Sequence, residues 1–545
     1  MPPPSAFICG STSPFKSKFL DLCHSPRCKQ LIQKKARRLL CGFVIIRIMP
    51  NRKPHQLNRR KFIQAAALTT GAVAFGVPTL VRAQNLNSKL NIAAIGAGGK
   101  GASDTDCCNS ENIVALCDVD SSHCAGQIKK YPDSKFYQDY RKLLDEMGKG
   151  IDAVTVSTPD HFHAIAASAA MRMGKHVYCQ KPLTQTIYEA RYLRNLAHES
   201  GVVTQMGNQG SSADGLRRAV EVIQSGVIGQ VSQVHIWTNR PIWPQGMGRP
   251  EGEDAVPATL DWNQWLGPAK VRPYKHGVYN PFAWRGWLDF GTGALGDMAC
   301  HTVNMPFRGL ALGYPTEIEA QPLFPMNQES YPIGSKIRFE FPARSLQIPA
   351  AHAGFFHRHD TVKFAPTTLW WYDGGQPLAD NPTSHDGSNK PPRDLTADIE
   401  EMLGEVPGSA CLLIGDKGKI FSPDDYGEQF FIKLNDEKKF THYTKHPAVA
   451  TVRQWVPRNP FSTVKMDADR RHHQEWIKAI KENKPENCYS RIAVGAQLTE
   501  IMLLGCVSLR VGKKLEWDGP NMVATNAPEA AQFIKRDNRS GFALS

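Results

Sequence analysis

A lysine, an aspartate and a histidine in this sequence have side-chain types that can take part in proton transfer. Asp297 and His301 are four residues apart, so on a helix they share one face and can both reach one hydroxyl group. Lys181 stands directly before Pro182, just after a short apolar run. An ammonium can stabilise a developing alkoxide, and an imidazole can accept the proton of an alcohol. These residues therefore suit acid–base chemistry on a hydroxyl group.

A glycine-rich turn follows the first apolar run after the N-terminal region. Residues 89–95 predict a buried strand. The pattern G-x-G-x-x-G comes next, and its glycines are Gly96, Gly98, Gly99 and Gly101. Gly96 permits the tight turn, Gly98 lets the backbone approach a pyrophosphate, and Gly101 lets the next helix pack closely. The amino end of that helix would face the phosphates.

An acidic residue stands where a dinucleotide site needs one. A second predicted strand, 113–117, ends at Asp118, about 20 residues after the glycine turn. A carboxylate there accepts hydrogen bonds from the adenosine ribose. The same charge repels a 2′-phosphate, so the sequence favours NAD over NADP as the cofactor.

Further apolar runs predict an α/β fold with a doubly wound parallel sheet, because strands and helices alternate. Strands are expected at 153–157, 175–179 and 202–206, and helices at 164–173 and 188–200. Ligands of such sheets bind at the carboxyl ends of the strands. The residues found there, which we predict to contact the cofactor, are Thr158, Pro159, His163, Lys181 and Pro182. For His163, a purely structural role in the turn is an equal alternative.

The ordered motifs resemble the Gfo/Idh/MocA family of oxidoreductases. The family's second motif is usually Glu-Lys-Pro, whereas this chain has Gln180 before Lys181. Its third motif, a glycine-rich turn, Gly-Asp, three residues and His, matches at Gly293, Gly296, Asp297 and His301. The resemblance implies a Rossmann domain followed by an α/β domain with an open, mostly antiparallel sheet, and association into homo-oligomers.

The resemblance also implies a reaction, the NAD-dependent oxidation or reduction of a secondary hydroxyl group of a carbohydrate or polyol. Lys181, Asp297 and His301 would be catalytic and would contact the substrate together with Arg285. Whether the lysine or the histidine is the principal acid–base group stays open. Two other functions are compatible with the motifs: a glycosidase that uses NAD transiently, and a sugar-binding protein without catalysis.

The net charge of +14 lies entirely in the N-terminal region. Residues 1–83 hold 15 of the 65 lysines and arginines and one of the 51 acidic residues, which leaves 50 of each sign in the rest. A basic folded domain would indicate a nucleic-acid partner. Because the remaining chain is balanced, we expect no nucleic-acid partner.

Residues 49–83 predict a twin-arginine-type export signal. Arg59 and Arg60 precede a mildly apolar stretch that ends in Val81-Arg82-Ala83. We expect translation to start at Met49, so that residues 1–48 are not made. The alternative is an uncleaved anchor, but the stretch is short of the ~20 strongly apolar residues that a membrane span requires. The expected partner is the twin-arginine machinery, and the expected location is the periplasm or another site outside the cytoplasm, after cleavage of the signal near Ala83. Free NAD is scarce there, so tight cofactor binding is expected.

Without this leader, two domains are expected, a Rossmann domain over 84–210 and a C-terminal α/β domain for substrate binding and oligomerisation over 211–545. No C-x-x-C pair occurs, and two histidines at spacing two, His357 and His359, are more often surface residues than metal ligands. We therefore expect no metal site. Residues 373–396 are rich in Gly, Pro, Asp and Asn, which predicts a long loop.

Overall fold

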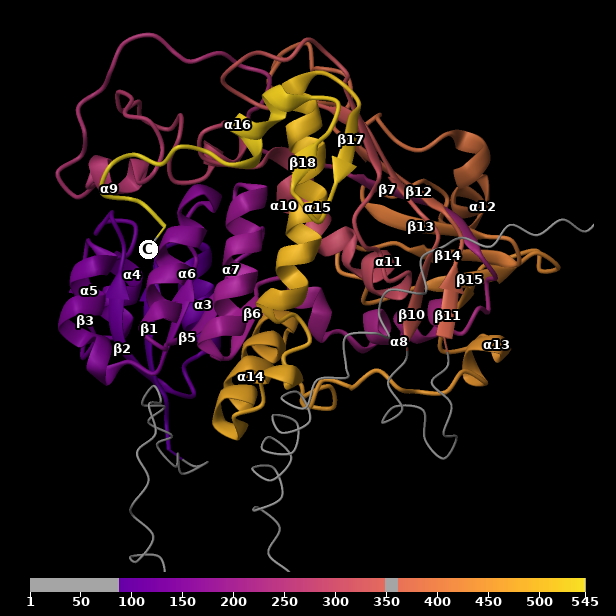
Figure 1. Ribbon diagram of the computed structural model, residues 1–545, viewed down its shortest axis with the longest axis horizontal. Coiled ribbons are helices and arrows are strands. Elements are labelled where there is room, and N and C mark those ends of the chain that lie inside the picture. Colours follow the sequence, from indigo (N-terminus) through magenta and orange to yellow (C-terminus); the bar gives the residue numbers. More distant parts are fainter. Residues whose placement is uncertain (1–87, 348–360, 545) are drawn as a thin grey trace, which may run out of the picture. The chain divides into compact units, whose positions relative to one another are not determined.

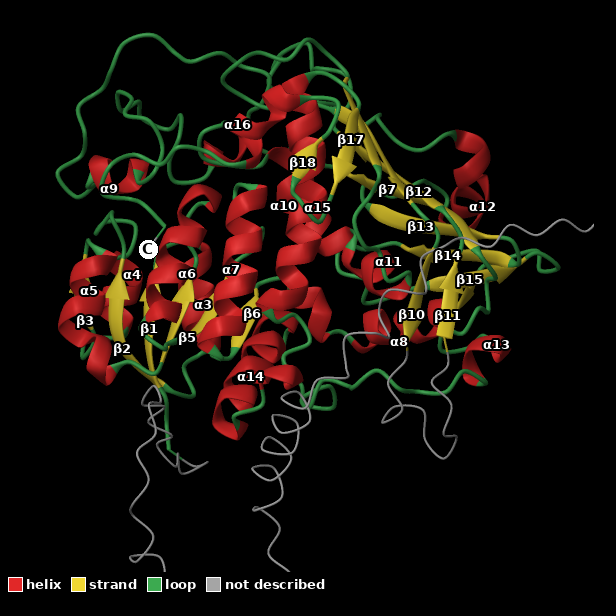
Figure 2. Cartoon of the chain, viewed as in Figure 1, coloured by secondary structure: helices red, strands yellow, loops and turns green. Residues whose placement is uncertain are grey.

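The computed structural model describes residues 88–347 and 361–544. The export signal and the His357–His359 pair fall outside the described residues, so both stay predictions. Figure 1 shows the course of the chain, and Figure 2 its helices and strands.

The first sheet has six strands in the order β3-β2-β1-β4-β5-β6. Every neighbouring pair is parallel, as predicted. The strands are β1 Asn91–Ile95, β2 Asn112–Cys117, β3 Lys135–Tyr137, β4 Ala153–Val156, β5 His176–Cys179 and β6 Thr204–Met206. The accompanying helices are α3 Lys100–Cys107, α4 Ala125–Lys130, α5 Tyr140–Met147, α6 Asp160–Arg172 and α7 Ile187–Ser200.

The second sheet has ten strands in the order β16-β15-β14-β13-β7-β12-β9-β8-β17-β18. Its neighbours are antiparallel except β7 and β12, which run parallel. The strands are β7 Val231–Thr238, β8 Glu317–Pro322, β9 Ser335–Phe341, β12 Thr367–Asp373, β13 Ala410–Gly415, β14 Gly418–Ser422, β15 Phe431–Leu434, β16 Thr441–His442, β17 Leu515–Asp518 and β18 Val523–Ala524. A separate hairpin consists of β10 Arg344–Gln347 and β11 Thr361–Phe364. The predicted fold class is confirmed.

The start of one of the remaining helices shortens the loop predicted over 373–396. They are α8 Asp214–Gln224, α9 Trp262–Leu266, α10 Gly293–Thr302, α11 Asn304–Gly309, α12 Arg393–Leu403, α13 Pro447–Ala450, α14 Ala468–Glu482, α15 Ile492–Val511 and α16 Ala531–Ile534. The loop predicted over 373–396 is shorter, because β12 ends at Asp373 and α12 begins at Arg393. Pro392 occupies the N-cap of α12, where the missing N–H costs nothing.

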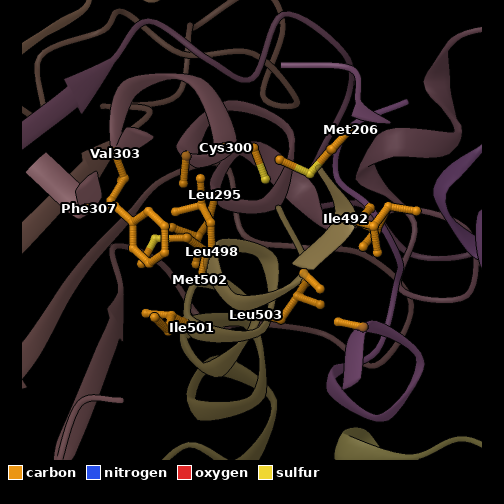
Figure 3. Close-up of a cluster of buried hydrophobic side chains, with 14 of the residues drawn as sticks. Met206, Leu295, Cys300, Val303, Phe307, Ile492, Leu498, Ile501, Met502 and Leu503 are labelled. Carbon is orange, nitrogen blue, oxygen red and sulfur yellow. The ribbon is translucent and has the colours of Figure 1, made fainter. Parts of the chain in front are cut away.

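Helix α15 contacts one strand of each sheet, β6 of the first and β8 of the second, and it also packs against helices α7 and α10. Figure 3 shows Leu498 and Met502 of α15 close to Leu295 of α10. Among the described residues, α15 is the one helix long and apolar enough to cross a membrane, and 83% of its apolar window is buried inside the protein. Burial on that scale is what a core helix requires.

Candidate active site

One cavity of about 450 Å³ connects the glycine turn with helix α10. Most of the predicted site residues line it: Gly96, Gly98, Gly99, Asp118, Thr158, Pro159, Lys181, Arg285, Asp297 and His301. The carboxyl ends of β1, β2, β4 and β5 open into this cavity, because parallel strands end at one edge of the sheet. The fold thus brings both predicted groups, the nucleotide contacts and the proton-transferring residues, into one space.

The glycine turn has the geometry that the pattern predicts. Gly96 has a φ of +79°, which a side chain would strain. A Cβ at Gly101 would lie 1.7 Å from the carbonyl oxygen of Gly96, so only glycine lets α3 pack against the turn. A Cβ at Gly98 would lie 2.2 Å from Cδ2 of His123. Gly96, Gly98 and Gly99 therefore contribute only backbone to the cavity wall, and the His123 ring lies against Gly98 there.

Asp118 is held against this turn from the end of β2. Its Oδ2 accepts a hydrogen bond of 2.8 Å from the amide of Gly98, and its Oδ1 accepts one of 3.0 Å from the amide of Asp120. The side chain is buried, and burial raises its pKa despite these two bonds. Each carboxylate oxygen accepts one bond from the protein, and so retains capacity for a further donor from a ligand.

Lys181 and Asp297 form an ion pair at the other end of the cavity. The Nζ of Lys181 lies 3.0 Å from Oδ1 of Asp297 and donates a 2.8 Å hydrogen bond to the Asp297 carbonyl oxygen. Arg285 donates from Nε to the same Oδ1 over 3.2 Å, and its guanidinium stacks on the Trp284 ring. Burial opposes ionisation of Asp297, but the two cations prevail and lower its pKa to about 2. Asp297 is therefore a carboxylate at neutral pH.

His301 lies one turn further along α10 and is neutral. It is 4% exposed, and burial, reinforced by the charge of Lys181, holds its pKa well below the usual value. Its buried Nδ1 has no hydrogen-bond partner among the described residues. Its ring packs edge-on against Tyr426 at 5.0 Å. A neutral imidazole has a free lone pair that can accept a proton.

Three predicted contacts lie behind the cavity wall instead of on it: Gly101, His163 and Pro182. The two ring nitrogens of His163 lie 2.8 Å from the Pro182 carbonyl oxygen and 2.7 Å from that of Thr158. His163 therefore joins the ends of β4 and β5 to helix α6. This placement matches the structural alternative for His163, with Gly101 and Pro182 shaping the wall from behind.

Asp160 also lines the cavity, although it belongs to none of the sequence motifs that predict the site. It is 2% exposed, and its Oδ2 accepts a 2.7 Å hydrogen bond from the hydroxyl of Thr292. Its Oδ1 is buried without a hydrogen-bond partner in the described part of the chain. Burial raises its pKa to about 7, against the hydrogen bond from Thr292. Its position directly after Thr158-Pro159, at the end of a predicted strand, was the available signal.

Arg240 and Tyr426 line the same end of the cavity and also escaped selection. Arg240 follows the end of β7 and forms no ion pair with a carboxylate within residues 88–347 and 361–544. Its guanidinium is thus available as a donor to a ligand. Tyr426 stands in a loop after β14, far from the motifs along the chain, and carries no local pattern. Within the described residues, no group of three or more His, Cys, Asp or Glu could hold a metal ion.

Residues 259–267 (the strap) cross from the second part of the chain to the first sheet. The amide of Asp261 donates to the Val119 carbonyl oxygen over 2.8 Å, and the amide of Ser121 donates to the Thr259 carbonyl oxygen over 3.0 Å. The side chain of Gln264 donates to Asp139 over 3.2 Å. Gln264 and Trp265 line the cavity together with Asp118. The strap therefore completes the cavity wall beside the residue predicted to bind ribose.

The C-terminal region holds the strap from the other side. Arg539 donates to the carbonyl oxygens of Asn263, over 2.7 Å, and Gly267, over 2.9 Å. It also donates to Oδ1 of Asn263 over 2.6 Å. The strap is thus fixed between the first sheet and Arg539.

Two family models match this chain. Residues 90–208 match "Oxidoreductase family, NAD-binding Rossmann fold", and residues 216–310 match "Oxidoreductase family, C-terminal alpha/beta domain", both of the Gfo/Idh/MocA family. The Rossmann match comes first and the α/β match second, and in the structure the parallel sheet likewise precedes the mixed sheet along the chain. Residues 90–208 and 216–310 are therefore similar to the two domains of the Gfo/Idh/MocA oxidoreductase family.

Two of the curated proteins that match this chain are dehydrogenases. Inositol 2-dehydrogenase of Salmonella typhimurium is 30% identical over 125 residues, which are 23% of this chain and 37% of that enzyme. D-glucoside 3-dehydrogenase of Escherichia coli is 28% identical over 149 residues, 27% of this chain and 42% of that enzyme. The chain thus matches less than half the length of these curated relatives.

The fold also resembles a solved structure. An inositol dehydrogenase homologue from Azotobacter vinelandii, complexed with NADH and myo-inositol, aligns with a TM-score of 0.50 and 15% sequence identity. The alignment covers 79% of this chain and 98% of that one. At this identity the likeness shows the fold.

Proposed function

We propose that this protein is an NAD-dependent oxidoreductase that acts on a secondary hydroxyl group of a sugar, polyol or related carbohydrate. One observation carries the proposal: a single cavity joins the glycine turn and Asp118 to Lys181, Asp297 and His301. The dehydrogenase names of the relatives, and the NADH and myo-inositol in the structural neighbour, support the same chemistry.

The residues present fit NAD. The bare backbone of Gly98 and Gly99 would hold the pyrophosphate, and Asp118 would hold the adenosine ribose while repelling a 2′-phosphate. When bound, NAD supplies hydride transfer at its nicotinamide ring. Thr158, Pro159 and Lys181, the other residues predicted to contact the cofactor at the cavity wall, line the same cavity.

The chain's own residues supply the proton chemistry. His301 is neutral and lines the cavity, and because its Nδ1 is buried, its Nε2 is the nitrogen that accepts the proton of the substrate hydroxyl. Lys181 donates a hydrogen bond to the developing alkoxide and stabilises its charge. Asp297 holds the Lys181 ammonium in place, and Arg285, stacked on Trp284, extends the donor surface toward the substrate.

A panel of sugars and polyols tests this proposal against its alternatives. A dehydrogenase yields a keto product together with reduced nicotinamide. Cleavage of a glycoside without net reduction would favour the glycosidase, and binding without either reaction would favour the sugar-binding protein. Both of those outcomes would overturn the proposal.

We further propose that the protein works after export through the twin-arginine pathway, as a homo-oligomer with tightly bound NAD. The strap beside Asp118 supports tight binding, because a wall fixed at both ends hinders release. Export rests on Arg59-Arg60 in the N-terminal sequence. Replacing both by lysine should leave the precursor in the cytoplasm, whereas unchanged periplasmic yield would contradict this route. Light scattering of the mature protein tests the oligomer.

A further inference from the structure

Asp104 of α3 is a fully buried carboxylate that accepts hydrogen bonds from three different parts of the chain. Its Oδ2 accepts hydrogen bonds from the Ser157 hydroxyl, over 2.7 Å, and from the Gln180 amide, over 2.8 Å. Its Oδ1 pairs with the Lys100 ammonium at 2.7 Å and lies 3.5 Å from Nε2 of His473. Burial opposes its ionisation, but Lys100 and His473 prevail and lower its pKa. Asp104 is therefore ionised.

Each hydrogen-bonded partner of Asp104 adjoins a residue of the proposed active site. Lys100 follows Gly99 of the glycine turn and itself lines the cavity. Ser157 precedes Thr158 at the end of β4, and Gln180 precedes Lys181 at the end of β5. Asp104 is absent from the cavity lining. It therefore acts on the site through its partners.

The same contacts explain the residue at position 180. A glutamate there, as in the usual Glu-Lys-Pro motif, would place a second buried carboxylate at hydrogen-bond distance from Asp104. Two carboxylates this close cannot both ionise, so one must bind a proton or move away. Gln180 offers an N–H in the same space and lets Asp104 keep its charge.

We infer that Asp104 is a positioning residue for the glycine turn and Lys181, and that Gln180 replaces the family's usual glutamate because Asp104 already supplies the carboxylate there. The inference rests on the proposed oxidoreductase function for its kinetic consequence. Its structural part, the coupling between positions 104 and 180, does not depend on that function.

The test is a cycle of four proteins: the wild type, Gln180→Glu, Asp104→Asn and the double variant. We expect Gln180→Glu to lower kcat by about tenfold or more, with the KM for the sugar changed by about twofold or less, because Lys181 is displaced while the substrate pocket persists. In the double variant a carboxylate and an amide face each other again, with their positions exchanged. We therefore expect most of the lost kcat to return. A double variant no better than Gln180→Glu would overturn the inference.

Gln205→Glu is the matched control. Gln205 is a fully buried glutamine on the neighbouring strand β6, and its amide donates to the His472 carbonyl oxygen. Adding Asp104→Asn to Gln205→Glu should give no rescue, since Asp104 accepts no bond from Gln205. Equal rescue at both positions would mean that Asp104→Asn acts unspecifically, and would refute the pairing.

Thermal unfolding of the same proteins separates this inference from the proposed function. Gln180→Glu should lower the Tm more than the double variant does. If the wild type oxidises no sugar, the proposed function fails, while the Tm cycle still decides the pairing. If Gln180→Glu does not accumulate, recovery of soluble protein by the double variant is the expected rescue, and its absence would overturn the pairing.

Discussion

At the scale of the residue, charge decides which side chains can act. The pKa of Asp297 is lowered to about 2 and that of His301 lies well below its usual value, so at neutral pH a carboxylate and a neutral imidazole stand one helical turn apart. Asp297 keeps the Lys181 ammonium in place, and the neutral His301 ring at the cavity wall is free to accept a proton. Burial opposes ionisation of both groups: the cations Lys181 and Arg285 overcome it at Asp297, whereas at His301 the charge of Lys181 adds to it.

Replacing Lys181 or His301 by alanine should therefore lower kcat. Each variant loses one proton-transfer or alkoxide-stabilising group, so we expect losses of about 10²–10⁴-fold. Lys175→Ala is the control, because Lys175 stands at the opposite end of β5 and donates to the Ile151 carbonyl oxygen. Steady-state kinetics of the three variants measures the effect. Full turnover by His301→Ala and Lys181→Ala would remove both residues from the mechanism.

Asp160 gives a pH dependence of stability. Its pKa is raised from 3.8 to about 7 by burial, so the folded protein keeps a proton that the unfolded chain releases. Asp160 therefore makes the folded state less stable as pH rises through that window, by on the order of 4 kcal/mol in total. Asp160→Asn should remove this loss. Chemical unfolding of both proteins across the window measures it, and parallel pH curves would contradict the expectation.

At the scale of the element, the close contact of α3 with the glycine turn sets the nucleotide site. Gly101→Ala would force a Cβ to within 1.7 Å of the Gly96 carbonyl oxygen. We expect bound nucleotide to be lost and stability to fall by about 2 kcal/mol or more.

Gly126→Ala provides the control for that variant. Gly126 is also helical, in α4, but a Cβ there meets nothing within 4 Å. It should keep its nucleotide and gain about 0.4–1 kcal/mol of stability. Equal behaviour of the two variants would show that helix entropy, and not the contact with Gly96, controls the site.

The elements also show what the sequence could and could not predict. Strands β1, β2 and β4 were predictable because each carries a nearly continuous apolar run, as strands of a buried parallel sheet do; β1 and β4 are buried almost throughout and β2 in its second half. Strand β3 escaped because it has three residues at the sheet edge. The strand pairing of the second sheet could not be predicted from the sequence, because β7 pairs with β12 and β13, which lie far along the chain.

The predictable part of the site is the part whose residues lie within short sequence motifs. Lys181, Asp297 and His301 belong to compact motifs, so the resemblance of those motifs to the Gfo/Idh/MocA family identified them. Tyr426 and Asp104 belong to none: the first comes from a distant loop, and the second matters through partners that only the fold assembles.

At the scale of the whole molecule, the strap connects the cofactor site to the C-terminal region. Arg539→Ala removes the hydrogen bonds that hold the strap at Asn263 and Gly267. Each is worth about 0.5–1.5 kcal/mol, so we expect NAD to dissociate roughly fivefold faster or more. Nucleotide loss during dialysis measures this. Arg393→Ala, which removes an exposed ion pair with Glu400, should release NAD at the wild-type rate.

A faster release in both variants would assign the effect to general destabilisation. An unchanged release in Arg539→Ala would mean that the strap does not retain the cofactor.

We propose that one cavity of this protein holds NAD, which oxidises a carbohydrate hydroxyl group, and that Lys181, Asp297 and His301 assist at the same place. The most direct measurement is a single turnover of the protein as purified, with no nucleotide added, followed through the near-ultraviolet absorbance of reduced nicotinamide. The account predicts about one NAD per chain and its stoichiometric reduction by a sugar or polyol, with no reduction in His301→Ala. Protein purified without nucleotide that also fails to reduce added NAD with any carbohydrate would contradict it.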